Sequence, residues 1–369
     1  MDLKNLTIAI VGGGYGGLAA AKALTVAGAN VTVYEQASEI KEVGAGIGLR
    51  PSSLAQFRAW GELEAITSVS NASESFQILT AEGHPIAEEI WPEVDAHGVT
   101  THLIHRGDFI EALFATLPKS MVKLGHRLEK IADNGPSATL SFADGRSETY
   151  DLVVAADGIK SVIREQLFTD SQPVFAGEHA YRVVVEDADL LSLVADGKLR
   201  MYIGRGTKVY LLPLLSRGQV SFDITALDVD GTWAPEVDLD YILKTVEGFD
   251  PRIVDATRRL DLAAVNKRAV YDIDPVERWS TDSVVLLGDA AHAMCHHQGQ
   301  GANSAILDAG ALAGALVAAA SVPEALEAYV AERKPVTDEL QRISRQGWSE
   351  DEVNDVFPGQ KPNSGRQEG

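Results

Sequence analysis

A stretch near the end of the sequence combines titratable side chains with glycines. Asp289 and His292 follow an apolar run, residues 283–287, that we predict to be a buried strand. Glycines then precede an alanine-rich run, residues 302–320, that we predict to be a buried helix. A strand, a glycine-rich turn and a helix start present backbone N–H groups and the positive end of a helix to a ligand. This pattern predicts a ligand site and leaves the ligand open.

The N-terminal residues carry a dinucleotide-binding pattern in its full context. The pattern runs through a strand over residues 6–11, the turn Gly12-Gly13-Gly14-Tyr15-Gly16-Gly17, a helix over residues 18–27 and a second strand over residues 30–34. Gly12 allows the tight turn, Gly14 lets the backbone approach a pyrophosphate, and Gly17 lets helix and strand pack closely. Glu35 ends the second strand, where an acid can bind a ribose hydroxyl and favours FAD or NAD over NADP. We therefore predict a dinucleotide site at this turn.

Three further motifs could face the same ligand. Gly44-Ala45-Gly46 lets a backbone lie close to a flat group, and Arg50 follows it. Arg106 comes just before a predicted helix, residues 109–117, as a phosphate-contacting arginine would. Asp157-Gly158 follows a predicted buried strand. Each motif alone also fits a packing loop, a surface arginine or a common turn, so only their combination points to a site.

The composition narrows the class of protein. The chain has 369 residues, a hydrophobic fraction of 45% and a net charge of -21, which fits a soluble globular protein of about two domains. The negative charge argues against nucleic acid and anionic membranes as partners. One cysteine allows no internal disulfide, and this together with the lack of a signal-peptide pattern favours the cytoplasm. The run over residues 302–320 contains Asn303 and Asp308, so we interpret it as a core helix. We expect a monomer or homodimer without stable membrane association.

Strand-rich segments interrupt the predicted nucleotide-binding fold. Between Gln219 and Thr225 polar and apolar residues alternate, as in a sheet with one polar and one buried face. We therefore predict an α/β protein in which a Rossmann-like domain is interleaved with a smaller sheet domain. We assign residues 1–73, 102–173 and 274–347 to the first domain, 74–101 and 174–273 to the second, and 348–369 to a tail with a disordered end. A final helix is predicted over residues 325–346, interrupted by Pro335.

Taken together, the motifs resemble those of the single-component flavoprotein aromatic hydroxylases. The motifs that carry this resemblance are Gly12 to Gly17 with Glu35, Asp157-Gly158 with Arg164, and Gly288-Asp289-Ala290-Ala291-His292. The resemblance covers residues 6–345 and is nearest to the salicylate hydroxylase and 6-hydroxynicotinate 3-monooxygenase branch. It implies a para-hydroxybenzoate hydroxylase-like fold. It also implies that NAD(P)H reduces FAD, that molecular oxygen forms a flavin hydroperoxide, and that this species hydroxylates an electron-rich ring.

The resemblance also implies cofactor roles for individual residues. Gly12, Gly14 and Glu35 would hold the ADP half of FAD. Asp289 would bind the ribityl hydroxyls, and the helix start after it would lie beside the flavin pyrimidine ring, where the helix dipole stabilises negative charge. The full predicted set is Gly12, Gly14, Tyr15, Gly17, Glu35, Gly46, Arg106, Asp157, Asp289, Gly301, Ala302 and Asn303.

One departure from the family pattern concerns two histidines. The family usually has a proline four residues beyond the histidine of the last motif, whereas this chain has His296 there, followed by His297. The exchange removes a rigid residue and adds titrating side chains. We predict that His297, and less strongly His296, faces the substrate as a base or hydrogen-bond partner; a structural or exposed histidine is the alternative. Further candidates are Tyr210 as a hydrogen-bond partner of a substrate oxygen, and Arg50, Tyr181, Arg182, Lys208 and Gln219 as other substrate contacts.

A metal site built from His292, Cys295, His296 and His297 is a weaker interpretation. No carboxylate or second cysteine completes the set, so we predict no metal. The sequence thus predicts an FAD-dependent NAD(P)H monooxygenase that hydroxylates a phenolic or hydroxypyridine-type ring, with accompanying decarboxylation left open. One alternative is an enzyme for a larger natural product or quinone precursor. Another is a non-catalytic flavin-fold binding protein of the GDP-dissociation-inhibitor kind, against which the retained Asp157-Gly158 and Gly288-Asp289 motifs argue.

Overall fold

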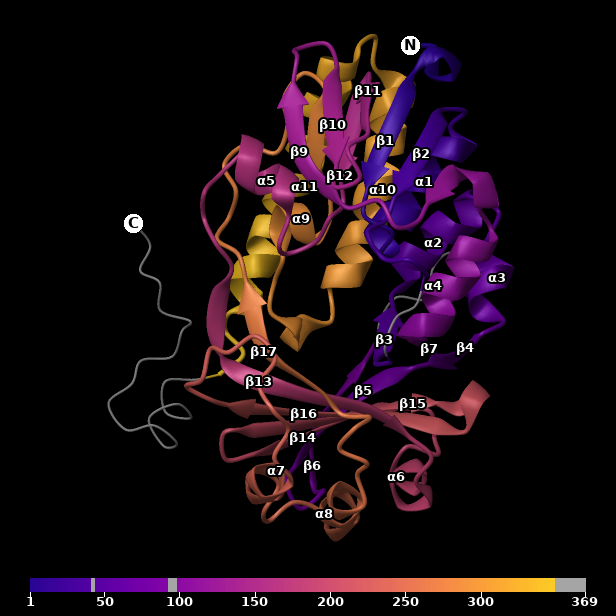
Figure 1. The fold of residues 1–369 in the computed structure, drawn as a ribbon. Coiled ribbons are helices and arrows are strands. Elements are labelled where there is room, and N and C mark those ends of the chain that lie inside the picture. Colours follow the sequence, from indigo (N-terminus) through magenta and orange to yellow (C-terminus); the bar gives the residue numbers. More distant parts are fainter. Residues whose placement is uncertain (41–43, 92–97, 349–369) are drawn as a thin grey trace.

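The molecule consists of a layered α/β part above a large, mostly antiparallel sheet (Figure 1). The computed structural model describes residues 1–40, 44–91 and 98–348. Most of the tail that we predict over residues 348–369 therefore lies outside the described residues, with Trp348 as its one described member.

The upper part is built on a five-stranded parallel sheet. Its strands, in spatial order, are β18 (Val284–Leu286), β12 (Leu152–Ala155), β1 (Thr7–Val11), β2 (Asn30–Tyr34) and β8 (Val122–Lys123). Parallel strands need helical crossovers and are covered on both faces, which explains their continuous apolar sequences. All four residues of β12 and all three of β18 are buried. The ends of β1, β12 and β18 therefore place the three sequence motifs beside one another.

Helices surround this sheet. The longer ones are α1 (Tyr15–Val26), α4 (Arg106–Ala115), α10 (Gly301–Ala318) and α11 (Val322–Ser344); the shorter ones are α2 (Pro51–Ala59), α3 (Leu63–Thr67), α5 (Val162–Leu167) and α9 (Asp289–His292). A small antiparallel sheet of β9 (Leu128–Asp133), β10 (Ala138–Phe142) and β11 (Ser147–Tyr150) completes the upper part. Helix α11 runs through Pro335 without a break, so the predicted interruption is wrong. Its buried face, which includes Tyr329 and Thr337, packs on the core and outweighs the one lost backbone hydrogen bond.

Helix α10 packs against α1, α2 and α11, in agreement with the interpretation of this run as a core helix. It is the one helix among the described residues that is long and apolar enough to cross a membrane, and half of it is buried inside the protein. Length and composition of this kind are shared by core helices of soluble proteins.

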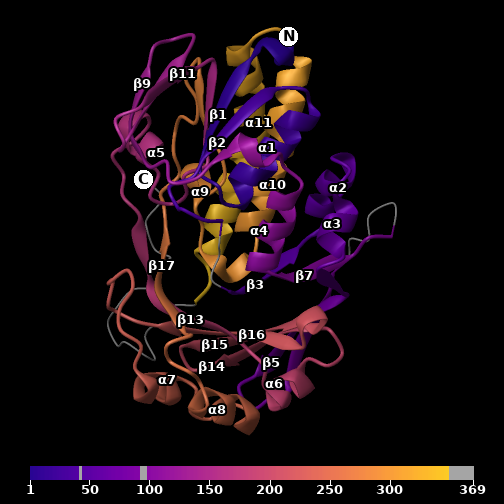
Figure 2. The same ribbon diagram turned by 45° about the vertical axis from the view of Figure 1, so that its right-hand side comes forward.

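The lower part is a seven-stranded sheet with helices on its far face (Figure 2). Its spatial order is β17 (Asn266–Asp272), β13 (Val174–Val185), β16 (Gln219–Leu227), β15 (Thr207–Leu214), β14 (Leu199–Gly204), β5 (Ser75–Thr80) and β6 (Pro85–Ile90). The covering helices are α6 (Ala188–Leu193), α7 (Leu239–Thr245) and α8 (Pro251–Arg258). A three-stranded sheet of β3 (Gly46–Leu49), β7 (Thr101–His105) and β4 (Ser70–Ser73) connects the two parts.

The alternation along β16 decides which side chains reach the centre of the molecule. Val220, Phe222 and Ile224 are buried in the hydrophobic cluster under the helices. Because successive side chains of a strand point to opposite faces, Ser221 and Asp223 project the other way, toward the upper part. The large sheet thus presents a polar floor to the nucleotide-binding layers, and this floor was visible in the sequence as a period of two.

Candidate active site

The first turn after β1 has the geometry that a nucleotide needs. Gly12 has a φ of +110°, and a side chain there would overlap the carbonyl oxygen of Ala156, the residue that follows β12. A side chain at Gly17 would overlap the carbonyl oxygen of Gly12, so helix α1 can approach the turn only without one. No atom lies within 4 Å of the place where a side chain of Gly14 would begin. Protein atoms therefore crowd the turn at Gly12 and Gly17, whereas the space beside Gly14 is open to a ligand.

Glu35 is fixed at the end of β2 by backbone donors. Its Oε2 accepts a hydrogen bond from the N–H of Gly13 at 2.6 Å, and its Oε1 accepts one from Ala37 at 2.8 Å. The carboxylate thus lies directly beside the glycine turn, where two sugar hydroxyls could donate to it. This position agrees with the predicted role of an acid at residue 35.

Asp157 is a half-buried residue beside the same turn. It accepts hydrogen bonds from the Ser161 hydroxyl at 2.5 Å and the Ile163 N–H at 3.3 Å. Burial raises the pKa of Asp157, and these donors offset only part of that effect. The buried Arg164 donates to the carbonyl of Ala290 at 3.0 Å, which ties this motif to helix α9. Two of the sequence motifs are therefore joined directly through Arg164.

The loop that carries Asp289 rests on a buried charged cluster. Asp308 of α10 accepts hydrogen bonds from the Gly288 N–H at 3.1 Å, from His292 at 2.6 Å and from Arg333 at 2.7 Å. All of these groups are buried. His292 is therefore a structural residue of the loop, while the neighbouring Asp289 stays exposed.

The start of helix α10 leaves its first backbone donors without intrahelical partners, as every helix does. The side chain of Asn303 is fully used within the protein: its oxygen accepts from Arg50 N–H and Ser53 hydroxyl, and its nitrogen donates to the carbonyls of Gly48 and Gly299. Asn303 thus joins α10 to β3 and α2, and only its backbone N–H remains to contact a ligand.

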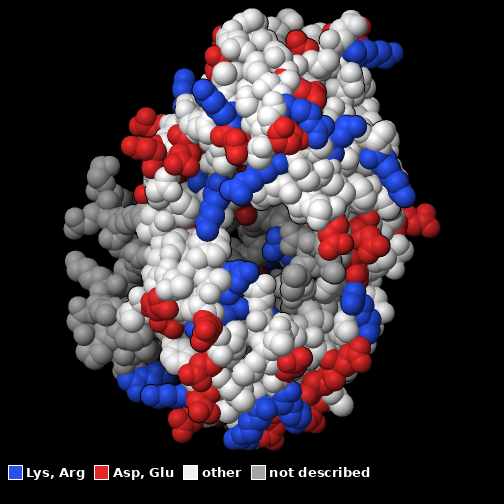
Figure 3. Space-filling model, in the orientation of Figure 1, with Lys and Arg blue, Asp and Glu red and all other residues white. Residues whose placement is uncertain are grey.

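A cavity of about 330 Å³ lies between the upper part and the polar floor of the large sheet. Figure 3 shows the hollow on this face, with basic side chains in and beside it. Arg50, Arg106 and Arg182 all line it, although the whole chain carries a net charge of -21. The guanidinium of Arg106 lies over the ring of Tyr15 at 4.8 Å, and that of Arg50 lies over Trp91 at 4.8 Å. The cavity is therefore locally basic and partly aromatic.

Along the floor a chain of hydrogen bonds leads to His296. Arg182 donates to Asp223 at 2.5 Å, Thr225 donates to the other oxygen of Asp223 at 2.8 Å, and His296 Nε2 lies 3.0 Å from the Thr225 hydroxyl. A carboxylate only accepts hydrogen bonds, so the single Thr225 proton goes to Asp223 and Nε2 must be the donor to Thr225. In the neutral ring Nδ1 then keeps its lone pair. This atom is buried and has no hydrogen-bond partner among the described residues.

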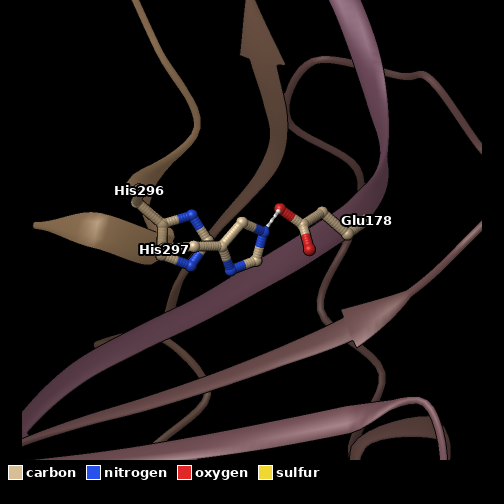
Figure 4. Close-up of side chains that lie close together, drawn as sticks. All are labelled: Glu178, His296 and His297. Atoms are coloured by element: carbon tan, nitrogen blue, oxygen red, sulfur yellow. Dashed lines mark ion pairs between the residues drawn. The ribbon is translucent and has the colours of Figure 1, made fainter. Parts of the chain in front are cut away.

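His297 belongs to a second buried group (Figure 4). Its Nε2 lies 2.9 Å from Oε1 of Glu178, a carboxylate of β13 with no exposed surface. The indole N–H of Trp348 donates to the other oxygen of Glu178. The rings of His296 and His297 stack with centroids 4.8 Å apart. Burial would raise the pKa of Glu178, but the neighbouring His297 and Trp348 lower it, so the carboxylate is charged.

Glu178, His296 and His297 could in principle offer three metal ligand atoms, which lie within 4.8 Å of one another. Glu178 already contacts a histidine and an indole donor, and no metal is needed to neutralise its charge. We therefore interpret the cluster as a carboxylate held between the His297 ring and the Trp348 indole, with the His296 ring stacked beside it, and retain the prediction of no metal.

Most of the predicted residues meet at this cavity. The lining includes Tyr15, Gly46, Arg50, Arg106, Tyr210, Asp289, His296, His297, Gly301 and Ala302. Tyr210 is buried, which raises its pKa, and its ring lies edge-on to His296 with centroids 6.1 Å apart. Gly12, Gly14, Gly17, Glu35 and Asp157 form the adjoining glycine turn.

Three predicted substrate contacts lie elsewhere. Tyr181 points to the opposite face of β13, into the hydrophobic cluster under the helices. Lys208 donates to the carbonyl of Gly347 and lies over the Trp348 ring at 4.0 Å. Gln219 bonds to Arg217 and Glu186 at the rim of the sheet. None of the three lines the cavity, because strand position alone does not tell which face or which end of a sheet meets a ligand.

Several residues of the site escaped the sequence prediction. Asp223 and Thr225 lie on the polar face of β16 that the period of two predicts, but this period does not distinguish them from Gln219, which belongs to the same face. Arg182, which is a candidate from the sequence, lies opposite Asp223 on the neighbouring strand. Glu178 and Trp348 are 170 residues apart in sequence and gave no signal of their contact.

Comparisons with known proteins agree with this geometry. Residues 5–344 match the family model described as FAD binding domain. The chain is 35% identical to the 3-amino-4-hydroxybenzoate 2-monooxygenase PtmB3 of Streptomyces platensis, over 92% of this chain and 87% of that protein. It is 32% identical to a 6-hydroxynicotinate 3-monooxygenase of Pseudomonas fluorescens, over 91% of this chain and 90% of that protein.

A solved structure has the same fold. HpxO of Klebsiella pneumoniae, crystallised as a variant complexed with FAD, superposes with a TM-score of 0.84 at 25% identity. The match covers 93% of this chain and 89% of that one. The predicted fold class is thereby confirmed.

Proposed function

Because this chain belongs to the FAD-dependent aromatic monooxygenases, we propose that it hydroxylates a single phenolic or hydroxypyridine-type ring that carries a negative charge. FAD, NAD(P)H and molecular oxygen are the cofactor and co-substrates of this family, and the bound flavin supplies the activated oxygen. The observation that carries the proposal is the hydrogen-bonded chain from Arg182 to His296 along the floor of the cavity.

The residues of the upper part fit FAD. The open glycine turn would receive the pyrophosphate, with Glu35 on the ribose of the adenosine. Asp289 is exposed at the cavity and would accept from the ribityl hydroxyls. The free N–H groups at Gly301 and Ala302 would face the flavin ring and stabilise negative charge on it.

His296 is the residue that we assign as base, in place of the His297 that we favoured from the sequence. Nε2 of His296 donates to Thr225, so Nδ1 carries the free lone pair. A ring hydroxyl that reaches Nδ1 gives up its proton to it, leaving a phenolate on the substrate and an imidazolium on the enzyme. Because Nδ1 is buried, this step requires the His296 ring to shift toward the cavity when the substrate binds. Burial, then the positive charges of Arg182, His297 and Lys208, lower the pKa of His296 well below its usual value, against the opposing charge of Glu178. His296 is thus neutral and ready to accept at pH 7.

The cavity favours a small anionic ring as substrate. At about 330 Å³ it lies near the lower end for ligand pockets, and it must hold the flavin ring as well. This argues for one aromatic ring and against the larger natural product or quinone precursor. Arg50 and Arg182 line the same space and would pair with a carboxylate. The similar proteins named above act on 3-amino-4-hydroxybenzoate and 6-hydroxynicotinate, which are both rings of this kind.

The test is a screen of aromatic and heteroaromatic acids with the FAD-loaded enzyme. We expect one class of hydroxylated aromatic acid to stimulate NADH or NADPH oxidation and to be converted into a product with one added oxygen, with or without loss of carbon dioxide. Mass spectrometry of the product distinguishes the two outcomes. Stimulation only by large neutral polycyclic compounds, or none by any ring acid, would contradict the proposal.

A further inference from the structure

Glu178 is a buried charge that the proposed deprotonation does not use directly. Its carboxylate has two contacts, one oxygen facing His297 at 2.9 Å and the other accepting from the indole of Trp348. Isolated buried carboxylates are costly, so two charged or polar partners indicate a built arrangement. A carboxylate only accepts, and His297 therefore presents Nε2–H to it.

The partner of Glu178 comes from the far end of the chain. Trp348 lies just after helix α11, packs edge-on against His297 at 6.1 Å and is covered by Lys208 at 4.0 Å. Gly347 lies against the ring of His297 so closely that any side chain there would overlap it. The carbonyl of Gly347 accepts from Lys208. The end of the described chain thus closes the back of the histidine pair.

We propose that Glu178, fixed by the Trp348 indole, is a positioning residue that holds His297 in one orientation and tautomer, and that His297 in turn supports the stacked ring of His296 as the proton acceptor. The inference rests on the proposed function of His296. It assigns a role at the active site to Gly347 and Trp348, which follow α11 and do not themselves line the cavity.

The geometry explains why a carboxylate is needed. A histidine ring whose Nε2 lies 2.9 Å from a buried carboxylate cannot flip without losing that close charged contact in a dry site. The His296 ring, 4.8 Å away, has one hydrogen bond among the described residues, at Nε2, and lies edge-on to Tyr210. The groups that face His296 are Arg182, Lys208 and His297 as cations or potential cations, and Glu178 and Asp223 as anions. Loss of the Glu178 charge therefore changes both the orientation of the pair and its electrostatics.

The experiment compares Glu178→Gln and Trp348→Phe with the wild-type holoenzyme. Histidine ring ¹⁵N spectra of the substrate-free enzyme should show His297 as the Nε2–H form in the wild type and altered His297 signals in Glu178→Gln, since an amide can donate as well as accept. With the panel acid that gives coupled turnover in the wild type, kcat of Glu178→Gln should fall about 10- to 100-fold, the range for losing a group that orients a functional histidine. More hydrogen peroxide should form per NAD(P)H consumed, while the FAD content stays unchanged.

Trp348→Phe keeps an aromatic but smaller ring and removes the N–H, so it should show the same changes to a smaller degree. Trp233→Phe is the matched control, because Trp233 stacks on Tyr271 outside the cavity lining. Unchanged His297 spectra together with wild-type coupling in Glu178→Gln would overturn the inference. A wild-type enzyme that converts no ring acid would instead refute the proposed function, and the ring spectra would still decide the role of Glu178.

Discussion

At the scale of single residues, the two adjacent histidines have different electrostatic environments. His296 is hydrogen-bonded to a neutral hydroxyl and surrounded mainly by positive charge, and its pKa is lowered by burial and by Arg182, His297 and Lys208. A base acts in its neutral form, so activity is lost only when pH falls through this lowered pKa. We predict that the acid limb of the kcat/KM profile lies below pH ~6.5, the usual histidine value. Measured over pH 5 to 8, an acid limb above pH ~7 would assign the proton transfer to another group.

Thr225 is the residue that sets the tautomer of His296. Thr225→Val keeps the shape of the side chain and removes the hydroxyl that joins Asp223 to His296. We predict a loss of kcat, smaller than the roughly 100- to 10,000-fold loss expected for His296→Ala. Thr225→Ser restores the hydroxyl and should recover most of the rate, while all three variants keep their FAD. Equal rates for the valine and serine variants would show that the hydroxyl has no such role.

At the scale of secondary structure elements, Asp308 connects α10, α11 and the loop before α9. Burial raises the pKa of Asp308, but His292 and Arg333 outweigh this and lower it. Because its folded-state pKa is lowered, Asp308 stabilises the fold at pH values above its unfolded-state pKa of about 3.9. This stabilisation is lost as pH falls through the folded-state pKa. Burial lowers the pKa of His292, but Asp308 outweighs this effect and raises it. His292 therefore stabilises the fold fully at pH values below its unfolded-state pKa of about 6.5, and this stabilisation is lost as pH rises through its folded-state pKa.

Asp308→Asn should therefore destabilise the protein strongly. The variant keeps the volume but leaves Arg333 as a buried charge without its carboxylate, which costs about 3 to 5 kcal/mol. Urea unfolding of the apo and FAD-loaded protein at pH 7 measures the change in unfolding free energy. Glu339→Gln is the control, because Glu339 pairs with Arg342 on the exposed side of α11, the helix that carries Arg333, and should change the stability far less. Equal effects of the two changes would show that burial of the ion pair does not matter.

The sequence predicts the structure correctly where a short segment alone determines it, as in a glycine turn or in the alternation of side chains along a strand. Gly12, Gly17 and Glu35 could be placed because the turn chemistry is local, and the two faces of β16 because a strand has a period of two. The contact of Trp348 with Glu178 could not be predicted, since it depends on how α11 ends above a sheet formed by distant strands. The roles of His296 and His297 also depend on contacts with distant strands, so their adjacent positions in the sequence could not decide which of them acts as the base.

At the scale of the whole molecule, a strongly negative protein surrounds a basic cavity. The net charge of -21 repels an anionic ring at long range, whereas Arg50 and Arg182 attract it only inside the cavity. The Debye length falls from about 30 Å at 0.01 M salt to about 10 Å at 0.1 M, so salt screens the distant repulsion more than the contact in the cavity. We predict that kcat/KM for an anionic ring acid rises a few-fold over this range at saturating NAD(P)H. The uncharged amide of the same acid should show no such rise, and a decrease for the acid would mean that local attraction by the arginines governs its capture.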